Sequence, residues 1–165
     1  MNTAIASISH QLEDAYNGDP WFGRSVKALL SDVNEQAAFI QPAGQHSILQ
    51  LVYHMINWRS FTINSLKPTK PVSVYDDNDW QHFDHNDKAL WPEGLQQLEA
   101  TQQELVTLLQ HKDDSILTSI VPGRKYDFRC LLNGLVQHDI YHAGQIAYVN
   151  KLLTARPDFP SEKAI

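Results

Sequence analysis

Apolar residues in this chain recur at intervals of three and four positions wherever their spacing is regular. Between Asp127 and Leu153 the inward series advances by 4, 3, 4, 3, 4 and 3 positions. Its members are Leu131, Leu135, His138, His142, Gln145, Val149 and Leu152. This repeat places all of them on one side of an α-helix and is typical of a helix that faces the interior of a bundle.

Three further segments show helical spacing and have clear ends. The first precedes the turn signal of residues 17–20, the second runs from Ser47 to about Leu66, and the third follows Pro92. The first carries the stripe Ile5, Ile8, Leu12, Ala15 and Tyr16, and the third carries Leu95, Leu98, Leu105, Leu108 and Leu109. Residues 21–40 are expected to hold one or two short helices. Four long helices without a convincing alternating strand predict an all-α four-helix bundle.

The polar, irregular segment from Lys67 to Leu90 separates the second and third long helices. A connection of this length can cross the bundle, so these two helices need not be antiparallel neighbours. The chain has 165 residues and no internal repeat. We therefore expect a single domain over residues 1–165.

Charge and cysteine content exclude several classes of protein. The chain has 13 Lys and Arg against 19 Asp and Glu, a net charge of −6, and no basic cluster that could neutralise nucleic-acid phosphates. It has neither a signal-peptide pattern nor the roughly 18 consecutive apolar residues of a membrane span. Cys130 is the single cysteine, which suits a reducing compartment and is interpreted as a small core residue. We expect a cytoplasmic protein that acts on a small molecule and binds neither nucleic acid nor membrane.

Histidines interrupt the inward stripes of two helices. His138 and His142 are four residues apart, so they differ by about 40° in direction and about 6 Å in rise and can direct their ring nitrogens at one ion at about 2.1 Å. His54 holds the middle position of the inward series Ser47, Leu51, His54, Trp58 and Phe61. Taken singly, each histidine also fits a hydrogen-bonded core residue. Taken together, they predict a metal site with His54, His138 and His142 as ligands.

Three imidazoles leave coordination positions open for a substrate, as catalytic sites do. Neutral imidazole suits zinc or nickel, with iron or manganese as alternatives. A bound divalent ion lowers the pKa of a water molecule or a thiol, so the site fits a metal-dependent hydrolase or thiol transferase. A non-catalytic metal- or ligand-binding bundle stays open as an alternative, and so does a metal-free helical interaction protein.

Other polar residues lie close to these histidines in the sequence. Asp139 is about 100° from His138 around the helix, so we expect it to hydrogen-bond an imidazole of a neighbouring helix rather than to bind the ion. Tyr141 and Gln145 share the histidine side and are candidates for orienting a bound water. His46 is expected to cap or flank its helix rather than to bind metal.

An acidic segment contains further residues of metal-binding type. Residues 76–104 include eight Asp and Glu and only Lys88 as a base. Within this segment lie Asp79, His82, His85 and Asp87. A solvated loop is the preferred interpretation, because charge runs usually face water, and such a loop is able to line the entrance to the site.

The two histidine segments together resemble the DinB-like (DinB/YfiT-like) superfamily of bacterial metalloproteins. The resemblance rests on HSILQLVYHMINW (46–58) and LLNGLVQHDIYHAGQIAYV (131–149), with the motif H-D-x-Y-H-x-G-Q at residues 138–145. It spans nearly the whole chain and implies an up-down-down-up bundle with a metal held by His54, His138 and His142. Some relatives are thiol S-transferases that use bacillithiol, mycothiol or glutathione, and others are described as hydrolases. The resemblance thus implies a low-molecular-weight thiol as a potential cofactor, and a homodimer as an alternative to a monomer.

Overall fold

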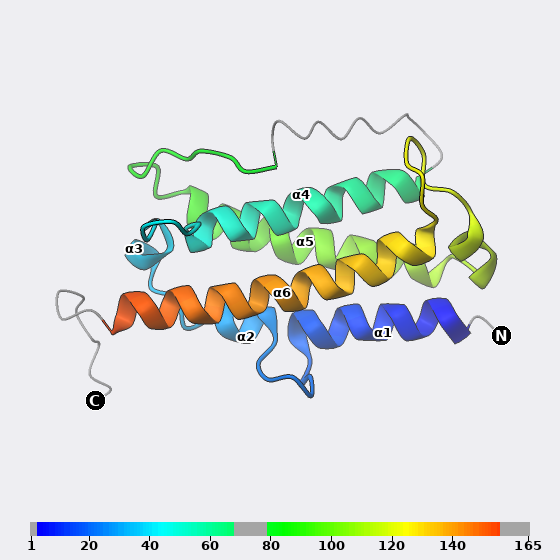
Figure 1. Ribbon diagram of the computed structural model, residues 1–165, viewed down its shortest axis with the longest axis horizontal. Helices are drawn as coiled ribbons and strands as arrows, with labels where there is room; N and C mark the ends of the chain where they lie inside the picture. The colour runs from blue at the N-terminus through cyan, green and yellow to red at the C-terminus, as the bar shows by residue number, and fades with distance from the viewer. Residues whose placement is uncertain (1–2, 68–78, 156–165) are drawn as a thin grey trace.

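Four long helices lie side by side in the computed structural model, which describes residues 3–67 and 79–155 (Figure 1). They are α1 (Thr3–Asn17), α4 (Ile48–Leu66), α5 (Leu90–Gln110) and α6 (Phe128–Thr154). Three short helices complete the described residues, namely α2 (Val26–Leu30), α3 (Glu35–Ala38) and the 3₁₀-helix η2 (Asp114–Thr118). The predicted all-α bundle is confirmed, with both α2 and α3 inside the segment 21–40.

Local sequence signals set the starts of the two helices that carry the histidines. Ser47 Oγ accepts a hydrogen bond from the backbone N–H of Gln50, and Gln50 Oε1 accepts one from the N–H of Ser47. This reciprocal pair is a capping box. The carboxylate of Asp127 caps α6 by accepting from the N–H of Cys130. Both helices therefore begin at defined residues, which decides where along each helix the histidines lie.

Helix directions follow a two-plus-two pattern. α1 and α6 run one way, and α4 and α5 run the other (Figure 1). α4 packs against α5 and α6, and α1 packs against the same two helices, so α1 and α4 occupy opposite corners of the bundle. Residues 79–89, the described part of the connection before α5, lie beside the first half of α4 (Figure 1). This arrangement brings the acidic segment to the face on which His54 lies.

The core consists of two apolar clusters with a polar layer between them. One cluster includes α2, α3 and the first half of α4, and the other includes the first part of α1, the end of α4 and the start of α6. Buried Arg59, Gln102 and Asp139 lie between these clusters along α4, α5 and α6. α1 buries the predicted stripe of Ile5, Ile8, Leu12, Ala15 and Tyr16.

The buried face of α6 is wider than the predicted stripe. Leu132, Val136, Asp139 and Ile146 are buried in addition to most of that stripe, and Leu153 is buried in place of Leu152. The reason is that α6 packs against α1, α2 and α4, whereas a coiled-coil seam faces a single partner. His138 and Gln145 are consequently half-buried at the edge of this face.

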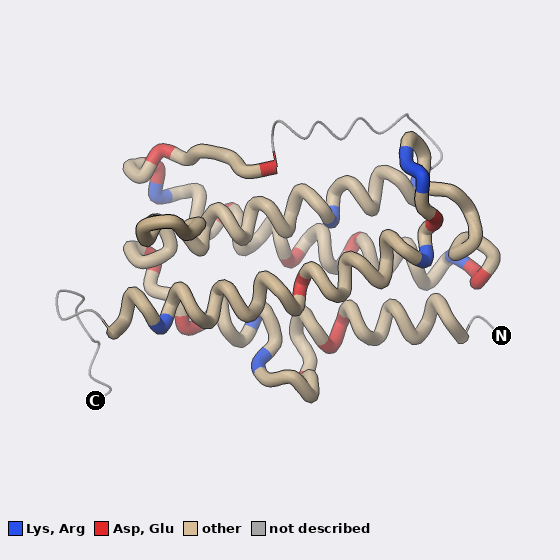
Figure 2. The backbone as a smooth tube through the Cα atoms, in the orientation of Figure 1, with Lys and Arg blue, Asp and Glu red and all other residues tan. Residues whose placement is uncertain are grey.

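The described helices include none that is both long and apolar enough to cross a membrane. Figure 2 shows charged residues on loops and along the helices, with both signs interspersed. Over the described residues, Lys and Arg form no continuous run along a helix (Figure 2).

Candidate metal centre

His54 from α4 converges with His138 and His142 from α6. Nε2 of His138 lies 2.9 Å from Nε2 of His54 and 3.0 Å from Nε2 of His142. The candidate ligand atoms of the three residues all lie within 4.8 Å of one another. Nitrogens that share an ion at about 2.1 Å are about 3.0–3.4 Å apart when the bond angles are about 90–110°. The structure thus brings the three predicted residues together, and the two nitrogen pairs that include His138 have the spacing of ligands on one metal ion.

Hydrogen bonds on the opposite ring nitrogen orient two of the three imidazoles. Nδ1 of His54 is 2.9 Å from the carboxylate Oδ1 of Asp79 and 3.1 Å from its carbonyl oxygen. Because both oxygens accept, this Nδ1 donates and carries the ring proton. Nδ1 of His142 donates to Oε1 of Gln145. Nε2 of both rings therefore presents a lone pair to the centre, as metal binding requires.

Hydrogen bonds alone do not satisfy the third imidazole. Nδ1 of His138 is buried and has no hydrogen-bond partner among the described residues. Its Nε2 is close to the lone pairs of both His54 and His142, and a single proton on Nε2 can serve only one of them. A cation at the centre would interact favourably with all three nitrogens at once. The donor set therefore fits a metal ion better than it fits a purely hydrogen-bonded core cluster.

Burial keeps the imidazoles of His138 and His142 neutral. Together with the positive charge that His142 and His54 carry when protonated, it lowers the pKa of His138 to about 3. Burial also lowers the pKa of His142 to about 4, although the bond to Gln145 opposes this shift. Neutral imidazole is the form that binds metal, so at neutral pH protons compete weakly for these two nitrogens.

The indole of Trp80 lies against His54. Its ring stacks on His54 at 4.0 Å and on His46 at 3.5 Å between centroids, and each pair is within 4° of parallel. Two imidazoles at these distances cannot share one face of an indole, so Trp80 lies between them. His46 is therefore next to the site but outside the group of three ligands, as its distance from His54 along the helix predicts.

In the described part of the acidic segment, Asp79 and Trp80 contact the site. Asp79 bonds to His54, whereas His82, His85 and Asp87 are exposed and outside the metal-binding group found among the described residues. The sequence predicts a solvated loop at Asp79, and no feature of it predicted the bond to His54. The available signal was an acidic residue, Asp79, directly before an aromatic one, Trp80. The bond from Asp79 to His54, however, depends on where the long connection returns to α4.

Asp139 has a different partner from the one predicted. Its Oδ2 accepts a hydrogen bond of 2.7 Å from Nη2 of Arg59, and both side chains are fully buried. Nε of Arg59 donates to Oε1 of Gln102 at 3.1 Å. The position of Asp139 around α6 directs it to the bundle axis, where the long side chain of Arg59 reaches it before any imidazole does. Burial raises the pKa of Asp139 to about 6, and Arg59 opposes this shift.

Gln145 and Tyr141 form a short chain from the site to the surface. Gln145 accepts from His142 through Oε1, and its Nε2 donates to the hydroxyl of Tyr141 at 3.3 Å. Tyr141 is an exposed side chain. Gln145 thus orients a histidine directly. The role of Tyr141 and Gln145 in orienting a bound water stays a prediction.

Comparison with known proteins gives one match. A family model described as the DinB superfamily matches residues 23–146, which include all three converging histidines. The match covers well over half of the chain and confirms the resemblance drawn from the motif at residues 138–145. No curated protein and no solved structure matches the chain.

Proposed function

We propose that this chain, which belongs to the DinB superfamily, binds one divalent metal ion through His54, His138 and His142 and uses it to transform a small molecule. The observation that carries the proposal is the convergence of three Nε2 atoms. That of His138 lies 2.9 Å from that of His54 and 3.0 Å from that of His142. Zinc or nickel suits three imidazoles, and iron or manganese are alternatives. Three protein ligands leave positions open for a substrate.

The reaction that fits such a site is thiol S-transfer or hydrolysis. When bound, the ion supplies a Lewis acid that lowers the pKa of a thiol or a water molecule. The protein's part is to hold the imidazoles in place, through Asp79 on His54 and Gln145 on His142, and to keep His138 and His142 neutral by burial. For transfer, a low-molecular-weight thiol would be the second substrate. We propose a small-molecule substrate because the described residues carry no continuous basic face for a nucleic acid (Figure 2).

Metal content and chelation test this function. We expect about one metal ion per chain by plasma mass spectrometry, lost on dialysis against a strong chelator and restored by zinc or nickel. We also expect the metal-free protein to keep its helical circular dichroism, because two apolar clusters hold the bundle together away from the histidines. A chain that unfolds without metal would instead have a structural site. A chain that takes up none of zinc, nickel, iron or manganese would contradict the proposal.

Replacing Asp79 with alanine is expected to weaken zinc binding by about 10–100-fold, the usual effect of losing a hydrogen bond behind a metal ligand. The side chain of Asp79 is 38% exposed, so its removal should leave the fold intact. Titration calorimetry on the metal-free protein measures the affinity. Asp87→Ala, at an exposed position in the same segment, is the matched control and should bind zinc as the wild type does. An equal loss in both variants would assign the effect to overall charge.

A further inference from the structure

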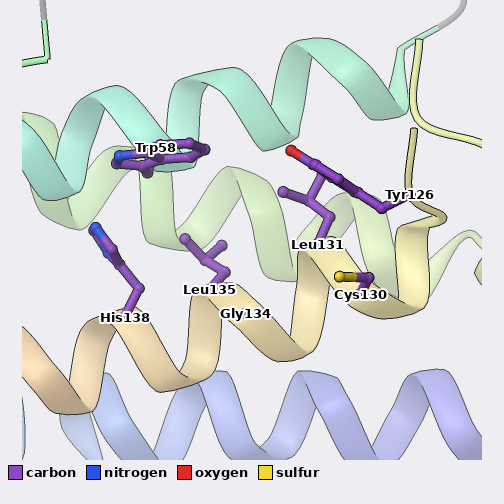
Figure 3. A pocket seen from close by; sticks show the side chains of 7 residues that line it. All are labelled: Trp58, Tyr126, Cys130, Leu131, Gly134, Leu135 and His138. Carbon is purple, nitrogen blue, oxygen red and sulfur yellow. The ribbon is translucent and has the colours of Figure 1, made fainter. Parts of the chain in front are cut away.

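An apolar cavity of about 240 Å³ lies beside the metal centre, between α4 and the first half of α6 (Figure 3). Trp58, Leu131 and Leu135 form its walls, and His138 lies at one end. Tyr126 and Cys130 lie at the other end (Figure 3). Cys130, interpreted from the sequence as a core residue, is exposed, because Phe128, Leu131 and Leu132 take the buried side of the first turns of α6.

We propose that this cavity holds the apolar part of a small molecule, an aromatic ring or a short alkyl chain, whose polar end binds at the three histidines. The proposal rests on the proposed function, since His138 belongs to both the metal centre and the cavity. A dry cavity of about 150 Å³ lined by aliphatic and aromatic side chains is large enough for benzene. A cavity of about 240 Å³ therefore admits a phenyl ring with a few further carbon atoms.

The lining determines which chemistry this part of the ligand has. Among the residues that the structure describes, no Lys, Arg, Asp or Glu lines the cavity, and its surface is almost entirely apolar. A carboxylate or phosphate placed there would lose its hydration without gaining a partner. The indole of Trp58, whose centroid is 5.9 Å from that of His138, offers an aromatic surface directly beside the metal ligand. The cavity thus selects an apolar group, and the histidines provide the place for a polar one.

Gly134 leaves this space open. A Cβ added at Gly134 would meet no atom within 4 Å, although the residue lies within α6. Glycine inside a helix is unfavourable relative to alanine, so this position lacks a side chain at some loss of stability. Gly94, by contrast, is required for packing, since a Cβ there would lie 2.9 Å from the ring of Tyr53. A Cβ at Gly134, which is one of the lining residues of the cavity, would therefore occupy open space.

The test fills the cavity from Gly134. Gly134→Leu is compared with Gly144→Leu, a matched control in the same helix where an added Cβ also meets nothing within 4 Å but which lies outside the cavity. The probes for the zinc-loaded protein are acetohydroxamate, benzohydroxamate and 4-phenylbutyrohydroxamate, which share one metal-binding head. We expect an aryl compound to bind wild type and Gly144→Leu at least about tenfold more tightly than acetohydroxamate. In Gly134→Leu this preference should disappear, with acetohydroxamate affinity unchanged.

Two results would overturn the proposal: equal affinities for the methyl and aryl compounds in the wild type, or an aryl preference that survives in Gly134→Leu. Gly134→Ala, which adds only a methyl group, should reduce the preference partially and covers the case in which the leucine variant misfolds. Binding of fluorobenzene to the metal-free protein, measured by fluorine NMR, distinguishes failure of the cavity proposal from failure of the proposed metal-dependent function. If zinc binds but fluorobenzene does not, the cavity proposal fails alone. If fluorobenzene binds but no zinc does, the proposed function fails, and a ligand shared with the histidines is refuted.

Discussion

Replacing His138 with alanine is expected to remove metal from the protein while the bundle stays folded. Its Nε2 is the nitrogen that lies within 2.9 and 3.0 Å of the other two, so its loss leaves two ligands instead of three. The affinity for zinc should fall by more than about a hundredfold, because even a partner behind a ligand contributes about 10–100-fold. The substitution also removes a crowded, half-satisfied imidazole, so we expect the free energy of unfolding to change by at most about 1–2 kcal/mol.

Plasma mass spectrometry after reconstitution and urea unfolding of the metal-free proteins measure the two effects. His46→Ala is the control, because His46 stacks on Trp80 at 3.5 Å but is outside the group of three ligands. It should retain one metal ion per chain. Full metal content in His138→Ala, or equal loss in both variants, would refute a site made of His54, His138 and His142.

Replacing Asp139 with alanine is expected to lower the free energy of unfolding by about 3–5 kcal/mol. Arg59 is completely buried and pairs with Asp139 at 2.7 Å. Without this carboxylate the guanidinium stays in the core, with the amide of Gln102 as its direct acceptor among the described residues. The large effect is therefore the free energy of an unpaired buried charge, which exceeds the net contribution of the ion pair.

A double variant distinguishes the free energy of the unpaired buried charge from the net contribution of the Arg59–Asp139 ion pair. Arg59→Met combined with Asp139→Leu removes both charges and keeps side-chain volume, so its stability should return to within about 1–2 kcal/mol of the wild type. Asp32→Ala is the exposed control: it removes the surface pair with Arg24 and should leave the urea midpoint almost unchanged. A double variant as unstable as Asp139→Ala would show that the loss arises from packing rather than from charge.

The elements and the convergence of the three histidines could be predicted because each depends on local periodicity. The stripe from Ile5 to Tyr16 and the capping pair of Ser47 and Gln50 are readable along the chain. His54 and His138 occupy positions that the same spacing turns toward the interior. Periodicity assigns a residue to one side of its helix, and in a bundle the apolar side of a helix faces the interior.

Contacts between distant segments could not be predicted in the same way. Asp79 and Trp80 reach His54 only because the long connection returns along α4, and no spacing rule describes such a path. The predicted partner of Asp139 was wrong because an angle of about 100° around α6 gives the direction of the side chain but not the residue that it meets. The long side chain of Arg59 reaches Asp139 from α4, and the spacing of the sequence does not indicate this contact.

The polar layer of Arg59, Gln102 and Asp139 also fixes the position of α6 along α4, and with it the relative positions of the three histidines. If α6 slid along α4 by one helical turn, about 5.4 Å, the guanidinium and the carboxylate would separate and each would be buried alone. The same slide would carry His138 and His142 away from His54. An alignment that brings the ion pair together therefore also brings His54, His138 and His142 together.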